Sequence, residues 1–479
     1  MDKNTTPEKS SNKKWQGGIT SVRLCGFKSF GRERKVEFRP LTILAGPNSC
    51  GKSSVMQPLL LMKQTLECGY DPGAFLLNGP HVRCTSADQI INNSAETSCK
   101  DQINISIGFN EKNEYRIVYK KNPKAGLEVL ETSLVIDSKE PLRIILNQTQ
   151  DQLQKIVPEG LLSLVSRVMA DKNEPYKRNK QKQKNANKNI PAPMPNLIAK
   201  RERCFLKIVA NSKYDNATFN LGPDNPVESH IRQILHLPGL RGNPERSYPT
   251  TGLTADNEEL YLPGTFEKYV ASILNYWQKN DQLKLKRLEE NLRLLGLANK
   301  LHTKVINDTQ VEIFVDRNYS SEDSKKCEYV SIADVGLGVS QTLPVAVALI
   351  FAKPNQIVYI EQPEIHLHPK AQLVMAKLLV ESASRGVKVI VETHSSLLIR
   401  GIQIAVAKKE IPHGLVKLHW FNKLQNGITE VSSADLDRNG AFGEWPEDFD
   451  DIALMAEMEY LNTVEEGMQS NDDYQKDGN

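Results

Sequence analysis

A glycine-rich segment near the start of the chain carries residue types that bind phosphate. Residues 46–53 read Gly-Pro-Asn-Ser-Cys-Gly-Lys-Ser and fit the pattern G-x-x-x-x-G-K-[ST]. Glycines let backbone N–H groups turn toward phosphate oxygens, Lys52 can reach the β- and γ-phosphates, and Ser53 can hold Mg²⁺. A chance match in an ordinary turn is the alternative. The sequence predicts an ATP site made of Gly46, Pro47, Asn48, Ser49, Cys50, Gly51, Lys52, Ser53 and Ser54.

Acidic residues follow an apolar run late in the chain. Residues 357–360 are apolar and lead into Glu361, Gln362 and, two residues on, Glu364, which is the form of a Walker B strand. A carboxylate at the carboxyl end of a parallel strand lies at the edge where a P-loop also opens, so Glu361 can reach the hydration shell of a metal. Buried strands ending in acidic turns also occur without function. Together with the P-loop, however, the pattern predicts Ser53 and Glu361 as the magnesium-binding pair.

Two further segments could contact the phosphates. His394 follows the apolar run 387–391 and could hydrogen-bond the γ-phosphate or the attacking water, although a lone histidine is more often structural. A glycine-rich turn opens a helix about twenty residues before Glu361, and a helix N-terminus is a place where anions bind. The residues of this turn that we predict to bind an anion are Gly336, Gly338 and Ser340.

Alternating strands and helices must position these residues. The continuous apolar runs 41–45, 357–360 and 387–391 are typical of strands buried on both faces of a sheet. Helical apolar spacing follows each of them, so the sequence predicts an α/β core. The other predicted helices cover 340–351, broken or started at Pro344, and 266–297, in one or two pieces. A hairpin of 19–27 with 34–38 and strands at 103–109, 115–119, 127–130, 133–136 and 311–315 complete the prediction.

The composition excludes several classes of protein. The 479 residues contain 61 Lys and Arg against 58 Asp and Glu, so the chain is not a histone-like cation and any nucleic-acid contact must be local. The longest apolar stretch is ten residues, against the roughly 20 that cross a bilayer, which predicts no membrane association. Seven scattered cysteines without C-x-x-C predict a reducing cytoplasm, with neither a disulfide nor a zinc site.

The order of these segments resembles a known group of proteins. A P-loop near the start is followed by a glycine–serine turn, a Walker B strand and a histidine, the last three within about sixty residues. This order, with "DVGLGVSQTLPVAVAL", "IEQPEIHLHPKAQ" and "VIVETHSSLLIRGI", resembles the ABC-type ATPase heads of the RecF, SMC and OLD families. "LPGLRGNPERSYP" and "GEWPEDFDD" are similar to bacterial members of antiphage defence systems, such as Septu PtuA-like or PARIS AriA-like subunits.

The resemblance implies a dimer that sandwiches two ATP molecules. The glycine–serine turn of one copy would contact the γ-phosphate held by the P-loop of the other. Such heads usually carry a glutamate after the Walker B acid, and this chain has Gln362 there. A neutral amide orients water but cannot accept its proton, so the departure predicts slow hydrolysis, with Glu364 as a substitute. The predicted catalytic residues are Glu361, Gln362, Glu364 and His394.

The resemblance also suggests how the chain is divided. We expect an N-terminal ATPase lobe at 18–155, an insertion at 156–310 and a C-terminal ATPase lobe at 311–465, between disordered tails at 1–17 and 466–479. The insertion holds a basic, proline-bearing loop at 170–200. Six of its lysines and arginines fall within 177–188, and this segment is either a solvated insertion or a contact to DNA or RNA phosphates.

Three functions remain open from the sequence. The first is an ATPase that controls a separate effector, a nuclease or toxin, in bacterial antiviral defence. The second is a RecF- or SMC-like ATPase acting on DNA in repair or maintenance. The third, a fused nuclease, has little support, because the one late D-x-D, Asp435 to Asp437, lies in a turn without an acidic partner. Arg241 and Arg246 either stabilise phosphate charge or pair with acids, and we favour the structural role.

Overall fold

A computed structural model describes residues 17–94, 98–110, 112–122, 126–172, 195–211, 218–221, 225–250, 261–316, 328–443 and 458–459. The predicted basic segment 177–188 and nearly all of both predicted tails lie outside these residues. Within the described chain, none of the helices combines the length and the apolar character that crossing a bilayer requires.

A six-stranded mixed sheet forms the centre of the molecule. Its strand order is β11-β16-β17-β3-β18-β19, and all neighbours are parallel except β19, which is antiparallel to β18. The strands are β3 (Leu41–Ala45), β11 (Leu235–Leu237), β16 (Ile357–Glu361), β17 (Lys388–Glu392), β18 (Val416–Lys423) and β19 (Thr429–Ala434). The three strands predicted to be buried therefore lie side by side, and their carboxyl ends meet at one edge.

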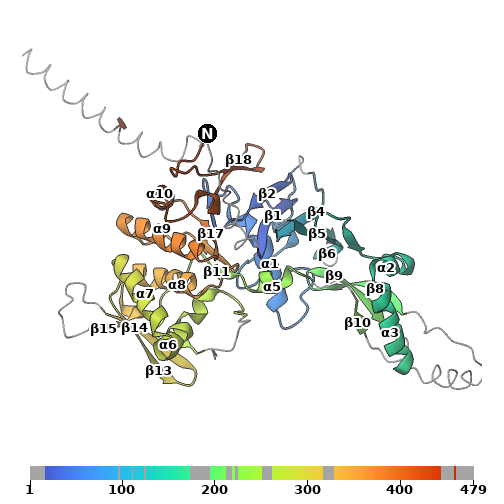
Figure 1. Ribbon diagram of the computed structural model, residues 1–479, viewed down its shortest axis with the longest axis horizontal. Helices are drawn as coiled ribbons and strands as arrows, with labels where there is room; N and C mark the ends of the chain where they lie inside the picture. The colour runs from blue at the N-terminus through green and yellow to red at the C-terminus, as the bar shows by residue number, and fades with distance from the viewer. Residues whose placement is uncertain are drawn as a thin grey trace, which may run out of the picture.

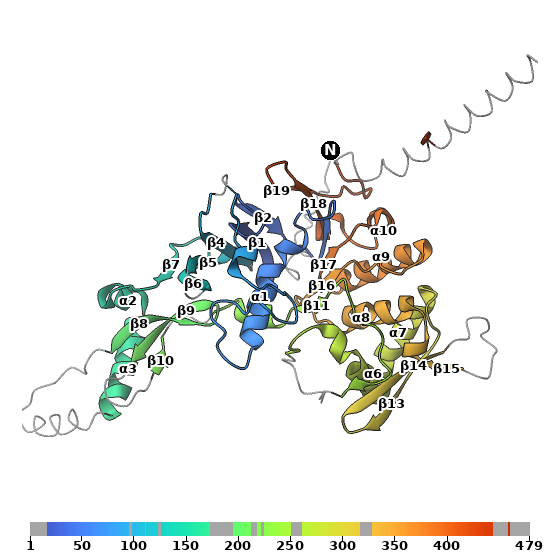
Figure 2. The same cartoon turned by 180° about the vertical axis from the view of Figure 1, so that it is seen from behind.

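The two faces of this sheet bury two separate cores. Val358 and Ile360 of β16 pack into one core, and Ile357 and Tyr359 pack into the other, because successive side chains of a strand point to opposite faces. The first core contains α6 (Val270–Asn280), α7 (Gln282–Leu294), α8 (Leu337–Phe351), α9 (Pro369–Ser384) and α10 (Ser396–Ala407). The second contains α1 (Gln57–Glu67) and the N-terminal β-sheet (Figures 1 and 2). Both faces are thus covered, as the runs of apolar residues predict.

An antiparallel sheet of order β2-β1-β4-β5-β6-β7 forms the N-terminal lobe. Its strands are β1 (Ile19–Cys25), β2 (Arg34–Glu37), β4 (Gln102–Phe109), β5 (Asn113–Asn122), β6 (Gly126–Val135) and β7 (Leu142–Ile145). The predicted hairpin of β1 with β2 is confirmed. Two strands predicted at 127–130 and 133–136 are instead the single strand β6, because Glu131 and Thr132 stay paired with β5 and only Leu130 is left out where the register shifts.

The segments that connect strands of the central sheet form further groups of helices and strands. One end of the molecule carries α2 (Gln150–Ile156), α3 (Glu159–Lys172) and a sheet of β8 (Asn196–Glu202), β9 (Phe205–Asn211) and β10 (Thr218–Asn220). The next helix, α5 (Glu228–Arg232), lies beside α1. The opposite end carries β12 (Tyr248–Pro249), β13 (Leu301–Asn307), β14 (Gln310–Asp316) and β15 (Tyr329–Ser331) beside α6 and α7 (Figures 1 and 2). Short 3-10 turns are η2 (Ser53–Val55), η3 (Ala87–Gln89), η4 (Phe266–Tyr269), η5 (Ile332–Asp334) and η6 (His413–Leu415). The fold is of the predicted α/β class, with a mixed central sheet, an antiparallel β lobe and an inserted helical region.

Two helical predictions are settled by local chemistry and packing. The segment 266–297 forms two helices, because Asp281 ends α6 and its side chain caps α7 by accepting from the Lys284 N–H at 3.2 Å. The expected break or start at Pro344 is wrong, since α8 runs through it. Residues 339–350 are all buried, and this tertiary packing outweighs the backbone hydrogen bond that a proline removes.

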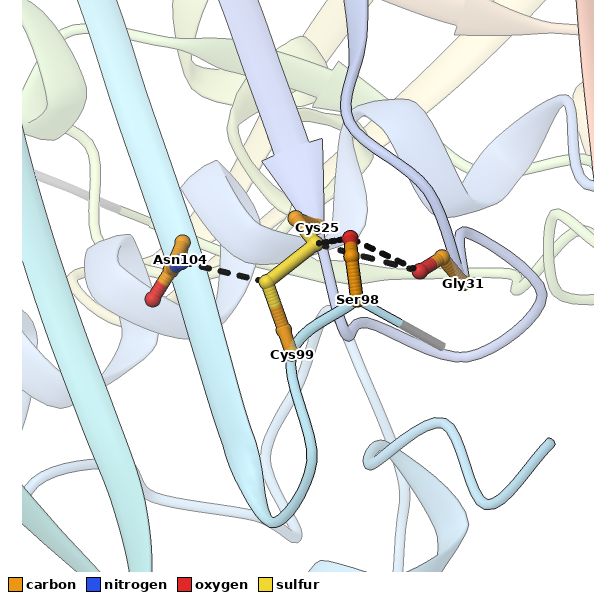
Figure 3. Close-up of a disulfide and its surroundings, with 5 residues drawn as sticks. All are labelled: Cys25, Gly31, Ser98, Cys99 and Asn104. Carbon is orange, nitrogen blue, oxygen red and sulfur yellow. Dashed lines mark hydrogen bonds between the residues drawn. A yellow bond between two sulfur atoms is a disulfide. The ribbon is translucent and has the colours of Figure 1, made fainter. Parts of the chain in front are cut away.

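A disulfide joins Cys25, at the end of β1, to Cys99 (Figure 3). Their Cα atoms are 6.2 Å apart although 74 residues separate them in sequence. The prediction of a chain without disulfides is wrong at this pair. Its physical basis is the pairing of β1 with β4, which places Asn104 opposite Cys25 and brings the preceding segment alongside. Spacing in the sequence cannot reveal such a contact.

Candidate nucleotide-binding site

The P-loop joins β3 to η2 and α1, and its backbone requires glycine at two positions. Gly46 and Gly51 have φ values of 140° and 104°, a region that other residues rarely adopt. A Cβ atom on Gly46 would lie 2.3 Å from the Phe421 carbonyl oxygen, and one on Gly51 would lie 2.6 Å from Thr429 Oγ1. The conformation and the packing against the C-terminal strands therefore both exclude side chains from these positions.

Lys52 is the second-to-last residue of the P-loop motif, and its side chain folds back onto the start of the loop. Its side chain is buried, and Nζ donates to the carbonyl oxygens of Gly46 at 3.0 Å and Pro47 at 2.7 Å. The ammonium group is thereby held against the backbone at the start of the loop. A cation in this position is suited to neutralise phosphate oxygens that approach the N–H groups of the loop.

Glu392, the last residue of β17, is a site residue that the sequence reasoning did not select. Its Oε1 accepts from Ser53 Oγ at 2.9 Å, and its Oε2 accepts from Tyr359 Oη at 2.9 Å. Burial raises the pKa of Glu392, with the charge of Glu361 acting in the same direction. The available signal was its place directly after the third predicted buried strand, 387–391, which the structure places between the P-loop strand and the Walker B strand.

Glu361 is oriented by donors from the edge strand β11 and the loop after it. Its Oε1 lies 3.2 Å from His236 Nε2, and its Oε2 accepts from the Gly239 N–H at 3.0 Å. Burial acts to raise the pKa of this carboxyl, but the hydrogen bonds from His236 and Gly239 outweigh it and hold the pKa below its ordinary value. Glu361 is therefore an ionised carboxylate with a fixed orientation.

The remaining predicted catalytic residues lie in the loops that follow β16 and β17. Gln362 has a left-handed backbone with φ 47°, and its N–H donates to the Glu392 carbonyl at 2.7 Å. Glu364 Oε1 accepts from the His394 N–H at 2.9 Å, and burial raises the Glu364 pKa. Burial and the charge of Lys52 lower the pKa of His394. Residues from β16 and β17 thus gather beside the P-loop.

The glycine–serine turn forms the N-terminus of α8. Gly336 is its N-cap residue, and Ser340 Oγ donates to the Leu337 carbonyl at 3.2 Å. Among the described residues, none of the hydrogen bonds of this turn reaches the P-loop. A Cβ atom on Gly336 would meet nothing within 4 Å, whereas one on Gly338 would lie 3.2 Å from the His366 carbonyl. The exposed start of α8 is therefore open to an external group.

Arg241 links α8 to the Walker B strand, β16. Its Nη1 donates to the Gln341 carbonyl at 2.9 Å and its Nη2 to the Glu361 carbonyl at 2.7 Å. Burial lowers its pKa to about 10. Arg246 pairs with Asp334 at 2.8 Å. Both arginines bond to this chain's own groups, in agreement with the structural role that we favoured.

The two acids of the late D-x-D also bond to groups of this chain. Asp435 pairs with Arg39 at 2.8 Å and with Lys417 at 2.9 Å. Asp437 Oδ1 accepts from the backbone N–H groups of Asn439 and Ala441. These acids serve an ion pair and a turn.

Comparisons with known proteins identify relatives of the chain. A family model described as an AAA ATPase domain matches residues 18–399. The Old nuclease of Escherichia phage P2 is 23% identical over 220 residues, which cover 39% of this chain and 37% of that protein. The chain thus matches well under half of the length of that relative.

Two solved structures of SMC heads share the arrangement of elements only distantly. A head bound to the C-winged helix domain of ScpA covers 88% of this chain and 98% of its own, with 13% identity and a TM-score of 0.45. A head with an extended coiled coil, bound to the C-terminal domain of ScpA derived from Pyrococcus furiosus, covers 94% and 99%, with 13% identity and a TM-score of 0.42.

Proposed function

The chain belongs to the AAA ATPase domain family, and from that premise we propose that it binds Mg-ATP at the site around Lys52. The observation that carries the proposal is the hydrogen bond from Ser53 to Glu392, with Glu361 on the adjacent strand. Mg²⁺ prefers oxygen ligands and is usually held by one or two carboxylates with waters and phosphates. Ser53 and Glu361 would hold the ion, and the ion would neutralise charge on the β- and γ-phosphates.

Calorimetric titration with Mg-ATP tests this proposal. Replacing Lys52 by alanine removes charge-assisted contacts to phosphate, so we expect Lys52→Ala to weaken binding by about 100-fold. Lys35, exposed on β2 of the same lobe, provides the control variant Lys35→Ala. Equal affinity of the Lys52→Ala variant and the wild type would refute the site.

We propose further that ATP joins two copies of the chain. Among the described residues, the P-loop makes no hydrogen bond to the backbone N–H groups at the start of α8. A helix N-terminus of this kind suits the γ-phosphate of ATP held by a second copy. Nucleotide would then favour the dimer because it contacts both subunits, and hydrolysis would remove the shared γ-phosphate and weaken the interface. Gln362 in place of glutamate makes this release slow.

The proposed task of this switch is the control of a separate effector, a nuclease or toxin, in bacterial antiviral defence. The similarity to the Old nuclease supports a link to nucleic-acid cleavage. Asp435 is engaged in ion pairs and Asp437 in a turn, so we assign cleavage to a separate protein. Sizing the chain together with the product of the neighbouring gene, in ATP and in ADP, tests it. We expect a complex whose size depends on the nucleotide, and identical profiles in both nucleotides would refute the control role.

A further inference from the structure

The hairpin of β18 and β19 brings a threonine to the P-loop. β18 is parallel to β3 and pairs Trp420 with Ala45, so its carboxyl end reaches the edge of the sheet where the P-loop begins. The hairpin returns at Thr429, the first residue of β19, which pairs with Lys423. The strand order therefore places Thr429 beside the P-loop, although 379 positions separate it from Cys50.

The hydroxyl of Thr429 bonds to the backbone of the P-loop. Its Oγ1 donates to the Cys50 carbonyl oxygen at 2.7 Å. The same Oγ1 lies 2.7 Å from Ser29 Oγ, and the Thr429 N–H donates to the Ser29 carbonyl at 2.8 Å. Thr429 is 0% exposed. Because the side chain is excluded from water, its bond to Cys50 is not exchanged for a bond to solvent.

This hydrogen bond sets the direction of the peptide between Cys50 and Gly51. The peptide is trans, and in a planar trans peptide the C=O and the N–H point in opposite directions. With the Cys50 carbonyl held toward Thr429, the Gly51 N–H points away from Thr429. Within the described part of the chain, that N–H donates to no other group. It is therefore open to a phosphate oxygen on the other side of the loop.

The backbone beside this peptide needs support from outside the loop. Ser49 has φ 59°, in the left-handed region that costs energy for a residue with a Cβ atom. Such a conformation persists where the surrounding structure holds it in place. The surroundings here are close, since a Cβ atom on Gly51 would lie 2.6 Å from Thr429 Oγ1 and 2.9 Å from Ser29 Oγ. Of these neighbours, Thr429 is the one that bonds to the peptide itself.

We propose that Thr429 is a positioning residue for phosphate binding. Its hydroxyl keeps the Gly51 N–H turned to the phosphate side before nucleotide arrives, so ATP meets a loop that is already in its binding conformation. Without the hydroxyl the peptide can rotate, and the apparent affinity falls in proportion to the fraction of molecules that keep the competent conformation. The inference rests on the proposed nucleotide site, and it adds a residue that acts through the backbone of the loop.

Calorimetric titration with Mg-ATP tests the role of the hydroxyl. Thr429→Val keeps the shape of the side chain and removes the hydroxyl, whereas Thr429→Ser keeps the hydroxyl and removes a methyl group. We expect Kd to rise by about tenfold for Thr429→Val and to stay within about twofold of the wild type for Thr429→Ser. Ser432→Ala removes an exposed hydroxyl from the same strand and is the control. Equal affinity of Thr429→Val and the wild type would overturn the inference.

Steady-state kinetics separate positioning from a general loss of structure. We expect Thr429→Val to raise KM for Mg-ATP by about tenfold with kcat unchanged, because the hydroxyl supports binding and does not act on the reacting atoms. A lower kcat at unchanged KM would contradict the proposed role. Should Thr429→Val fail to fold, Thr429→Ala against Thr429→Ser makes the same comparison, since both lack the methyl group and only serine carries the hydroxyl. Equal affinity of those two variants would likewise overturn the inference.

The Lys52→Ala variant, titrated in parallel, distinguishes two kinds of failure. If Lys52→Ala binds Mg-ATP like the wild type, the nucleotide site itself is refuted, and the role of Thr429 with it. If Lys52→Ala binds weakly while Thr429→Val binds normally, the site stands and only the role of Thr429 is refuted.

Discussion

At the scale of single residues, the site is organised by hydrogen bonds to carboxylates. Glu392 accepts from Ser53 and Tyr359, while Glu361 accepts from His236 and Gly239. Burial raises the pKa of the first, and hydrogen bonding lowers that of the second. Two acids on neighbouring strands thus have different proton affinities because their donors differ.

The first prediction concerns Glu392. A Glu392→Gln variant keeps the size of the side chain but removes the charge that orients Ser53. We expect activity, or the apparent affinity for Mg²⁺ in the presence of ATP, to fall by about 10–100-fold. Magnesium titrations of ATP turnover provide the measurement, and Glu410→Gln, at an exposed position beyond α10, is the control. An unchanged magnesium dependence would remove Glu392 from the site.

The second prediction concerns Gln362. A Gln362→Glu variant supplies a carboxylate that can accept a proton from water, and general-base catalysis typically contributes about 10²–10⁴-fold. We expect steady-state phosphate release to accelerate by at least about 10²-fold. If the wild type already turns over ATP rapidly and the variant does not differ, the proposed slow hydrolysis is wrong.

At the scale of secondary-structure elements, helix packing depends on small residues at close contacts. Helices α9 and α10 lie together on one face of the central sheet (Figure 1). A Cβ atom on Gly401 of α10 would lie 2.6 Å from Ala376 Cβ of α9. Glycine at this position therefore sets how closely the two helices approach.

The third prediction follows from that contact. Gly401→Ala would gain about 1 kcal/mol in helix propensity but overfill the interface, and overpacking typically costs about 1–3 kcal/mol. We expect a lower urea midpoint, with recovery in the double variant that adds Ala376→Gly. Gly414→Ala is the control, because a Cβ atom there meets nothing within 4 Å. A more stable Gly401→Ala protein would show that the helices can separate at little cost.

At the scale of the whole molecule, the P-loop and the start of α8 are two candidate phosphate-binding segments far apart in the sequence. Within the described chain, the hydrogen bonds of Lys52 stay inside the P-loop, and those of Ser340 stay inside α8. In a single copy, these hydrogen bonds do not join the P-loop to the start of α8. This is the physical basis for proposing that a second copy supplies the missing half.

The fourth prediction tests that assembly. Gly336 has ordinary backbone angles and open space around it, so Gly336→Glu should leave the folded monomer and its ATP affinity intact. The added carboxylate would, however, repel a γ-phosphate presented by another copy. We expect sedimentation to show ATP-dependent dimers for the wild type and for Gly414→Glu, but monomers for Gly336→Glu. Dimerisation of Gly336→Glu in ATP would contradict the sandwich.

The sequence by itself determined the buried strands of the central sheet and the turn of the P-loop. The apolar runs at 41–45 and 387–391 predicted buried parallel strands, and these strands are adjacent in the structure. The turn at Gly46 and Gly51 could be predicted because its conformation depends on consecutive residues. Such features are local, since strand periodicity and backbone angles are set by neighbours in the chain.

Only the tertiary structure decided which distant residues meet. Ser53 and Glu392 are 339 positions apart, and His81 and His236 are 155 apart, yet both pairs are joined by hydrogen bonds. The disulfide of Cys25 with Cys99 and the passage of α8 through Pro344 likewise depend on packing. The reason is physical: burial removes water, so most buried polar groups find a partner wherever the folded chain provides one.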